Sequence, residues 1–296
     1  MYKFTPIRKT LVWGTEDWVI SGVPDNESVV AEGPEAGKKI TDLYPGQFPL
    51  LIKFIDTKQD LSVQVHPDDE LAMARYGLNG KTEMWYVIGA APGAKLMSGL
   101  KEQITPDDYV RLVEQDRITD VLAEHTVAPG DVFFLPAGRI HAIGGGCFLA
   151  EIQQTSDLTY RIYDYNRPGL DGKPRQLHTQ EAKDAIDYRV YPEYRTEYES
   201  RRDAPVELVK CAHFTTELYT LTRGIDIAIP GRAGDDKGFL ILIGISGRTR
   251  LRTAQDETVL SAGEAVLVPA ADGALSALPL LVEGDGGSAS FLTTHL

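Results

Sequence analysis

The most distinctive pattern in this chain is the segment 61–66, which reads Leu-Ser-Val-Gln-Val-His. Its alternation of apolar and polar residues predicts a β-strand with two unlike faces. The polar face carries Ser62, Gln64 and His66 rather than the charged residues that usually face solvent. Because residues two apart on a strand share a face, Gln64 and His66 can both reach one small ligand, and a metal ion is the simplest such ligand.

Short apolar runs recur along the chain and are separated by glycine, proline and aspartate. Many short strands at regular spacing are typical of an all-β sandwich or barrel. We expect strands at 50–56, 61–66, 84–89, 131–135, 148–153, 239–243, 249–252 and 265–268. Helical patterns are few, and they predict short helices at 67–74, after the N-cap residue Thr105, and at 179–186. The fold class is therefore expected to be mainly β.

An imperfect internal repeat runs through the chain. The segment 130–136 (Gly-Asp-Val-Phe-Phe-Leu-Pro) matches 263–269 (Gly-Glu-Ala-Val-Leu-Val-Pro). Upstream of these, 84–89 matches 239–244 in the same order. Two matches in the same order favour duplication of a β-rich unit.

The repeat predicts two domains, 1–195 and 196–296, joined by a polar connector near 192–205. Superposing the repeats places Gly238 where Glu83 stands and Ala274 where His141 stands. We therefore expect an N-terminal domain that binds a metal and a degenerate C-terminal domain without metal ligands.

The composition narrows the class of protein and its partners. With 296 residues, 43% of them hydrophobic, the chain can bury a sizeable core. A net charge of −13 argues against nucleic acid or an anionic membrane as partner, but a local cluster of Lys and Arg could still bind a small phosphorylated molecule. Two cysteines, no signal-peptide pattern and no long apolar run indicate a cytoplasmic protein. The sequence leaves monomer and homodimer open.

A second motif supplies further candidate ligands. The pattern Gly-x5-Pro-x-Gly-x2-His ends at His141 and matches the second motif of the cupin superfamily, a double-stranded β-barrel that often holds a metal. Glu83 opens another expected strand. Alone, each residue is more simply explained as a surface or hydrogen-bonded group. Together, Gln64, His66, Glu83 and His141 suit Zn²⁺, although two histidines with one carboxylate also describe non-haem iron sites.

Several segments resemble type I phosphomannose isomerases (mannose-6-phosphate isomerases) in their short bacterial form. The resemblance is dense over residues 1–190 and loose beyond 205. It is carried by 14–18, 48–56, 61–69, 80–86, 135–143, 151–161 and 163–167. It implies two cupin-type β-barrels (a bicupin), and one zinc ion per chain on Gln64, His66, Glu83 and His141. It also implies conversion of mannose 6-phosphate to fructose 6-phosphate.

The resemblance also assigns roles to charged residues. It places the family's active-site arginine at Arg161 and its active-site lysine at Lys81, which could stabilise enediolate charge or hold the phosphate. Arg161 could equally form an ion pair with Asp157 or Asp164. The longer enzymes often have a histidine before the lysine, but here that position is Gly80.

Two further residues are candidates on the strands near the metal. Glu151 could carry a proton between C1 and C2 or support the metal ligands, and its simplest alternative is a structural ion pair. Ser62 shares the face of Gln64 and could contact the substrate. The proton-transfer residue stays open at this level.

Two other functions remain alternatives. One is an Fe(II) cupin oxygenase, because a facial triad of two histidines and a carboxylate also supports oxygen chemistry. The other is a non-catalytic sugar-phosphate-binding cupin that has kept the barrel without turnover.

Overall fold

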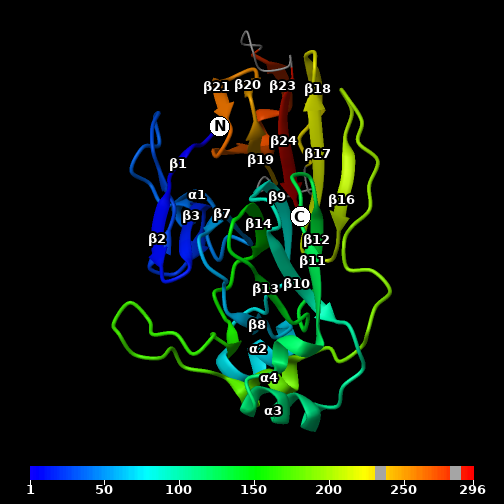
Figure 1. Ribbon diagram of the computed structural model, residues 1–296. Coiled ribbons are helices and arrows are strands. Elements are labelled where there is room, and N and C mark those ends of the chain that lie inside the picture. Colours follow the sequence, from blue (N-terminus) through cyan, green and yellow to red (C-terminus); the bar gives the residue numbers. More distant parts are fainter. Residues whose placement is uncertain (231–237, 281–287) are drawn as a thin grey trace. The chain divides into compact units, whose positions relative to one another are not determined.

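The chain folds mainly into β-strands with a few short helices, as the pattern predicts (Figure 1). This is a computed structural model. It describes residues 1–230, 238–280 and 288–296. Within these ranges, no helix combines the length and apolar character needed to cross a membrane.

The chain forms two compact units, and each gathers segments from distant parts of the sequence. Unit 1 contains Met1–Pro6, Glu27–Phe48 and Glu197–Leu296. Unit 2 contains Ile7–Asn26 and Pro49–Thr196, and it holds every candidate site residue. The functional division into domains 1–195 and 196–296 stays a prediction.

Unit 2 consists of two antiparallel sheets with a shared apolar interior. The six-stranded sheet has the order β12 (Val132–Leu135), β9 (Glu83–Ala90), β14 (Cys147–Gln154), β7 (Leu50–Thr57), β3 (Gly14–Ile20) and β2 (Ile7–Leu11). The five-stranded sheet has the order β11 (Leu122–Thr126), β10 (Lys95–Leu100), β13 (His141–Ile143), β8 (Val63–Val65) and β15 (Tyr160–Tyr163). Trp85, Phe133 and Leu96 pack between the sheets, so residues that face this interior are removed from water.

Short helices gather beside β8 in Figure 1, and all but the first of them contribute to an apolar cluster with the five-stranded sheet. They are α2 (Asp69–Tyr76), α3 (Pro106–Glu114), α4 (Thr179–Ala185) and the 3₁₀ helix η1 (Ile118–Val121). The predicted cap of α3 is confirmed, because the Thr105 hydroxyl accepts a hydrogen bond from the Asp108 N–H at 3.1 Å. The Asp108 carboxylate in turn accepts from the Thr105 N–H.

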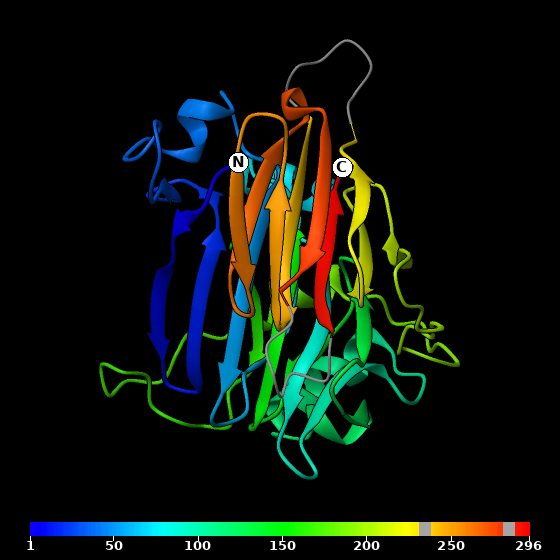
Figure 2. The same ribbon diagram turned by 90° about the horizontal axis from the view of Figure 1, so that it is seen from above.

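Unit 1 also has two antiparallel sheets, which stack face to face over one apolar cluster (Figure 2). One has the order β16 (Val206–Lys210), β17 (Thr215–Leu221), β24 (Ala289–His295), β19 (Phe239–Ser246) and β22 (Ala265–Pro269). The other has the order β18 (Ile225–Ala228), β23 (Ala274–Pro279), β20 (Arg248–Arg252) and β21 (Glu257–Ser261). The remaining short elements are β1 (Phe4–Thr5), β4 (Gly22–Val23), β5 (Asn26–Glu27), β6 (Val29–Val30), α1 (Ile40–Leu43) and η2 (Ala270–Asp272).

The internal repeat is visible as identical strand order in the two units. The order β12-β9-β14-β7 in unit 2 corresponds to β22-β19-β24-β17 in unit 1. The order β11-β10-β13-β8 likewise corresponds to β21-β20-β23-β18. The eight successive strands β7 to β14 of unit 2 therefore follow the same path as β17 to β24 of unit 1, which supports duplication.

Strand register corrects the sequence superposition of the repeats. In unit 2, Glu83 lies opposite Leu135, the residue before Pro136. In unit 1, the residue before the matching Pro269 is Val268, and it lies opposite Leu240 rather than Gly238. Leu240 and Gly238 differ by two positions, so they share a face.

The counterpart of His141 shifts by one residue. Ala274 is exposed, whereas Leu275 is fully buried in the cluster between the sheets and pairs with Ile227, as His141 pairs with Gln64. A shift of one residue moves a side chain to the opposite face of a sheet. The inward positions of unit 1 that match Gln64, Glu83 and His141 are therefore aliphatic.

Candidate metal centre and active site

Antiparallel pairing places several predicted site residues in one row across the five-stranded sheet. Gln64 on β8 lies directly opposite His141 on β13 and, on its other side, opposite Arg161 on β15. Directly paired residues have their side chains on the same face. The polar face of the segment 61–66 is thus turned away from solvent: Ser62 and His66 are each 2% exposed.

Three candidate ligands meet in the interior of unit 2. His66 Nε2 lies 3.6 Å from one Glu83 carboxylate oxygen, and His141 Nε2 lies 3.4 Å from the other. One potential ligand atom from each residue lies within 4.8 Å of the others. All three side chains are almost fully buried. Two imidazole nitrogens and a carboxylate at this spacing can hold one divalent transition-metal ion.

Backbone carbonyls orient both imidazoles. His66 Nδ1 donates to the Leu158 carbonyl at 2.9 Å, and His141 Nδ1 donates to the Arg139 carbonyl at 2.8 Å. With the proton on Nδ1, each Nε2 presents a lone pair toward Glu83. Burial lowers the pKa of His66 well below its usual value and the pKa of His141 to about 4. Both rings are therefore neutral near pH 7, as metal ligands must be.

The Glu83 carboxylate is the group that most requires a cation. It is 0% exposed, and among the described residues neither of its oxygens accepts a hydrogen bond of good geometry, although Lys81 Nζ lies 2.7 Å from one of them. Burial, and next the charge of Glu151, raise the pKa of Glu83 to about 7. A buried carboxylate with unmet acceptor capacity fits a metal ligand.

Gln64 completes the predicted four-residue set. Its amide nitrogen lies 3.2 Å from His141 Nε2. The nitrogen and oxygen of a carboxamide exchange places by a half-turn of the amide. A bound metal favours the oxygen at this position, because a carboxamide binds cations through oxygen.

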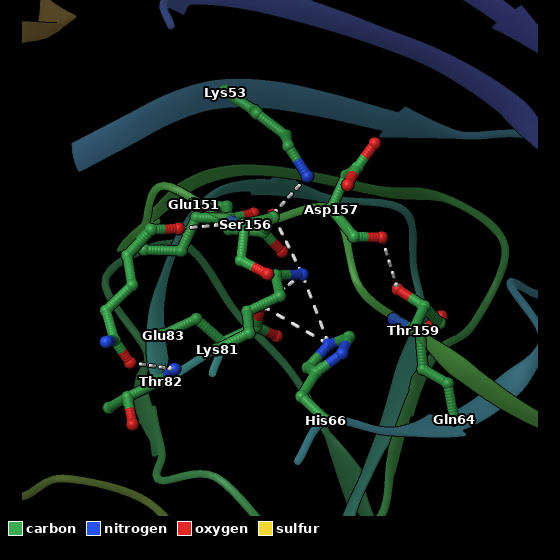
Figure 3. Close-up of polar contacts among 12 residues, drawn as sticks. Lys53, Gln64, His66, Lys81, Thr82, Glu83, Glu151, Ser156, Asp157 and Thr159 are labelled. Atoms are coloured by element: carbon green, nitrogen blue, oxygen red, sulfur yellow. Dashed lines mark hydrogen bonds and ion pairs between the residues drawn. The ribbon is translucent and has the colours of Figure 1, made fainter. Parts of the chain in front are cut away.

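A buried chain of opposite charges lies beside the metal ligands (Figure 3). Lys81 Nζ contacts both Glu83 and His66 Nε2, at 2.7 and 3.1 Å, and lies 3.8 Å from Glu151. Lys53 on β7 donates to Glu151 at 2.8 Å. Lys81 is only 3% exposed, although it follows the turn-forming residues Asn79 and Gly80.

Glu151 is held as a carboxylate. Burial alone would raise its pKa, but the charges of Lys53 and Lys81 outweigh that effect and lower the pKa to about 2. Trp85 Nε1 donates to its second oxygen at 2.9 Å. The side chain is thus ionised and fixed in position, and it reaches the wall of an open cleft.

This cleft has a volume of about 350 Å³. Its wall brings together most of the remaining predicted residues and one that the sequence reasoning missed. The lining includes Ser62, Gln64, Lys81, Glu151, Arg161 and Arg175. The candidate ligands His66, Glu83 and His141 are almost fully buried and are not among the residues that line this cleft.

Arg161 has no ion pair with Asp157 or Asp164 in the part of the chain that the structure describes. Asp164 instead receives two other arginines, Arg167 at 2.8 Å and Arg175 at 2.6 Å. The Arg161 Nε is buried without a hydrogen-bond partner among the described residues, and one terminal nitrogen donates to the Gln176 carbonyl. Burial, and next the charge of Arg175, lower the pKa of Arg161. Arg161 is thus available to an anion.

Sequence reasoning missed Lys53, Trp85 and Arg175. Lys53 interrupts the apolar run 50–55, and a lysine within an otherwise apolar strand is a signal of a buried ion pair. Trp85 lies two residues after Glu83 and therefore shares its face. Arg175 follows a proline in a polar loop, and no local pattern distinguishes it.

A buried set of candidate metal ligands next to a cleft lined by arginine and lysine is typical of metal-dependent enzymes that act on small anionic molecules. Comparison with known proteins agrees with this class. Residues 15–87 match the model of the phosphomannose isomerase type I catalytic domain.

Whole-chain relatives extend this match. The chain is 31% identical to mannose-6-phosphate isomerase ManA of Bacillus subtilis, over 90% of this chain and 92% of that protein. It is 38% identical to the mannose-6-phosphate isomerase of Streptococcus mutans over 58% of the chain. The crystal structure of a Bacillus subtilis mannose 6-phosphate isomerase superposes with a TM-score of 0.87 and 29% identity, and the match covers 100% of this chain and 99% of that one. This chain therefore belongs to the type I phosphomannose isomerase family.

Proposed function

We propose that this chain is a metal-dependent aldose–ketose isomerase that interconverts mannose 6-phosphate and fructose 6-phosphate through a cis-enediol intermediate. The observation that carries the proposal is the Glu83 carboxylate, buried between His66 and His141 with its acceptor capacity unmet. Lys81 Nζ lies 2.7 Å from one of its oxygens, and a metal ion between the two imidazoles would satisfy the acceptor capacity that this buried anion still has. The names of the relatives supply mannose 6-phosphate as the substrate, and fructose 6-phosphate is the ketose that an aldose–ketose isomerisation forms from it.

The proposed cofactor is one Zn²⁺ per chain, held by Gln64, His66, Glu83 and His141. Two imidazoles, one carboxylate and one carboxamide oxygen suit zinc with a position left for a sugar oxygen. A related mannose 6-phosphate isomerase has been crystallised with zinc bound; at 16% identity and a TM-score of 0.75 it supports the fold. When bound, the metal supplies Lewis acidity at the oxygens on C1 and C2.

The cationic end of the cleft is proposed to hold the phosphate. Arg161 and Arg175 both line the cleft, and Arg161 lacks an anionic partner among the described residues. Asp164 binds Arg175 through two short contacts and so fixes its guanidinium beside Arg161. A phosphate can accept hydrogen bonds from both guanidinium groups, and its negative charge offsets the repulsion between the two arginines. Ser62 lines the same cleft and can contact the sugar.

Proton transfer is assigned to the residues between the metal and the cleft. Glu151 is ionised, so it can accept the proton from C1 or C2 and return it to the other carbon. Lys53 and Trp85 hold it in one orientation. Lys81 lies close enough to the ligands to stabilise the negative charge that develops on the enediol oxygens.

Two cupin-barrel domains are proposed: a catalytic one (1–195), which contains unit 2 apart from its last residue, and a structural one (196–296), which supplies the larger part of unit 1. The repeated strand order supports this, and so do the aliphatic residues at the inward positions of unit 1. Two cysteines, too few for a disulfide framework, support a reducing and therefore cytoplasmic location. The oligomeric state, monomer or homodimer, is to be measured.

A coupled assay for fructose 6-phosphate, started with mannose 6-phosphate, tests the function. We expect turnover that stops after dialysis against a chelator and returns with Zn²⁺. His141→Ala should lose both metal and activity. Full activity in a metal-free His141→Ala protein would reject the metal-dependent mechanism, and bound sugar phosphate without turnover would favour a sensor.

A further inference from the structure

The turn between β12 and β13 sets the orientation of the proposed ligand His141. Arg139 lies two residues before His141, and its carbonyl accepts the His141 Nδ1–H at 2.8 Å. This hydrogen bond fixes the plane of the ring and the direction of Nε2. Any shift of the backbone at Arg139 therefore moves the nitrogen that faces Glu83.

The side chain of Arg139 is held in an unusual way. It is only 9% exposed, and among the described residues no carboxylate forms an ion pair with its guanidinium. The guanidinium carbon instead lies 4.7 Å from the ring centre of Tyr191 and 4.6 Å from that of Tyr194. Cation–π contacts of this kind gain strength when they are shielded from water.

The two rings belong to one anchored segment, residues 187–194, which we call the tyrosine strap. Its first residue, Asp187, donates its N–H to the Gly138 carbonyl at 2.8 Å. At its other end, the Tyr194 hydroxyl donates to the Leu100 carbonyl at 2.7 Å and accepts from the Tyr191 N–H. The strap is therefore tied to the β12–β13 turn and to the end of β10, with Arg139 between them.

We propose that Arg139 is a positioning residue for the metal ligand His141, held by the tyrosine strap, so that metal affinity depends on the contacts of Tyr191 and Tyr194. The inference rests on the proposed function only in taking His141 as a ligand. Among the described residues, the strap's hydrogen bonds and ring contacts reach Gly138, Arg139 and Leu100 rather than the proposed ligands, so the strap acts through the Arg139 backbone. Loss of partners that orient a metal ligand typically weakens metal binding about 10- to 100-fold.

Zinc affinity, measured by competition with a chromophoric chelator, tests the proposal without relying on activity. Arg139→Ala and Tyr191→Leu should each raise the zinc dissociation constant about 10-fold or more. Arg189→Ala is the matched control. Its guanidinium also lies over the Tyr191 ring, at 5.5 Å, but its side chain is 77% exposed and contacts Asp187 rather than the turn. We expect this variant to bind zinc as the wild type does.

Two further readouts separate positioning from general destabilisation. A merely structural role lowers the melting temperatures of the metal-free and zinc-loaded proteins equally, whereas a positioning role reduces the difference between them. The double variant Arg139→Ala/Tyr191→Leu should bind zinc no more weakly than Arg139→Ala, because both changes act through one contact.

The outcomes are distinct. If the wild type binds zinc and both single variants bind it within twofold, the proposal is overturned. If Arg139→Ala does not fold, Tyr191→Leu alone decides, because Tyr191 is only partly buried and its loss is less disruptive to the fold. A wild-type protein that binds no zinc would overturn this inference together with the metal site.

Discussion

Arg161 lies directly opposite Gln64 in the antiparallel pairing of β15 with β8. Gln64 in turn lies opposite His141 on β13. Three adjacent strands thus present a guanidinium, a carboxamide and an imidazole on one face. This row places the proposed phosphate-binding group beside the proposed metal ligands, and it makes the cleft suitable for a substrate with an anionic end and oxygens that a metal can bind.

Removing the metal should lower stability as well as activity. A ligand that binds only the folded protein stabilises it by about 4 kcal/mol at a thousand times its dissociation constant. We expect the melting temperature to fall on treatment with a chelator and to recover with Zn²⁺, as followed by calorimetry. Identical melting curves with and without the metal would contradict a site at His66, Glu83 and His141.

Lys53→Met should destabilise the protein and change its acid sensitivity. The 2.8 Å contact of Lys53 with Glu151 is buried, and removing one partner of a buried pair costs about 3–5 kcal/mol. Because the folded protein lowers the pKa of Glu151 to about 2, the ionised group contributes stability above its ordinary value near pH 4.5 and loses it as the pH falls toward 2.

Denaturant unfolding between pH 2 and 7 measures this effect. The wild type should lose stability steeply below pH 4.5, and Lys53→Met should lose less over the same interval because its Glu151 is less strongly shifted. Lys58→Met, which removes an exposed lysine paired with Asp56, is the control and should match the wild type. Parallel profiles for all three proteins would show that Lys53 does not hold Glu151 ionised.

Arg175→Gln should raise KM for mannose 6-phosphate about 10-fold and weaken inhibition by inorganic phosphate to a similar degree, as expected for loss of one charged hydrogen-bonding group. Arg167→Gln is a close control, because Arg167 also binds Asp164 but is not among the residues that line the cleft. We expect nearly unchanged KM for that variant. Equal effects of both substitutions would indicate that KM rises because Asp164 loses an arginine partner, and not because a phosphate contact is lost.

Gly138→Ala should weaken both the fold and the metal site. Gly138 has a φ of +89°, and a Cβ there would lie 3.0 Å from the Ala185 carbonyl oxygen. The positive φ costs a non-glycine residue about 1–2 kcal/mol before any clash. Thermal melting and zinc titration should both show the loss. Gly77→Ala is the control, because Gly77 also has a positive φ but has open space around it. Any stability that this variant loses comes from backbone strain alone, without a clash.

Much of the site follows from local sequence. The alternation at 61–66 places Gln64 and His66 on one face, and the Pro-x-Gly turn before His141 indicates the third candidate ligand. Glu83 follows from its place at the start of an apolar strand. The expected strands and the cap of α3 are confirmed because they depend on neighbouring residues alone.

Other features depend on contacts between residues far apart in the chain, and only the tertiary structure decides them. Lys53 meets Glu151 across two paired strands, Asp164 binds Arg175 while Arg161 has no ion pair among the described residues, and the tyrosine strap reaches Arg139. The sequence alone determined which residue types could bind a metal and on which strands they lie. Register, which local patterns do not encode, decided which side chains face each other, and for that reason Leu275 rather than Ala274 takes the inward place of His141.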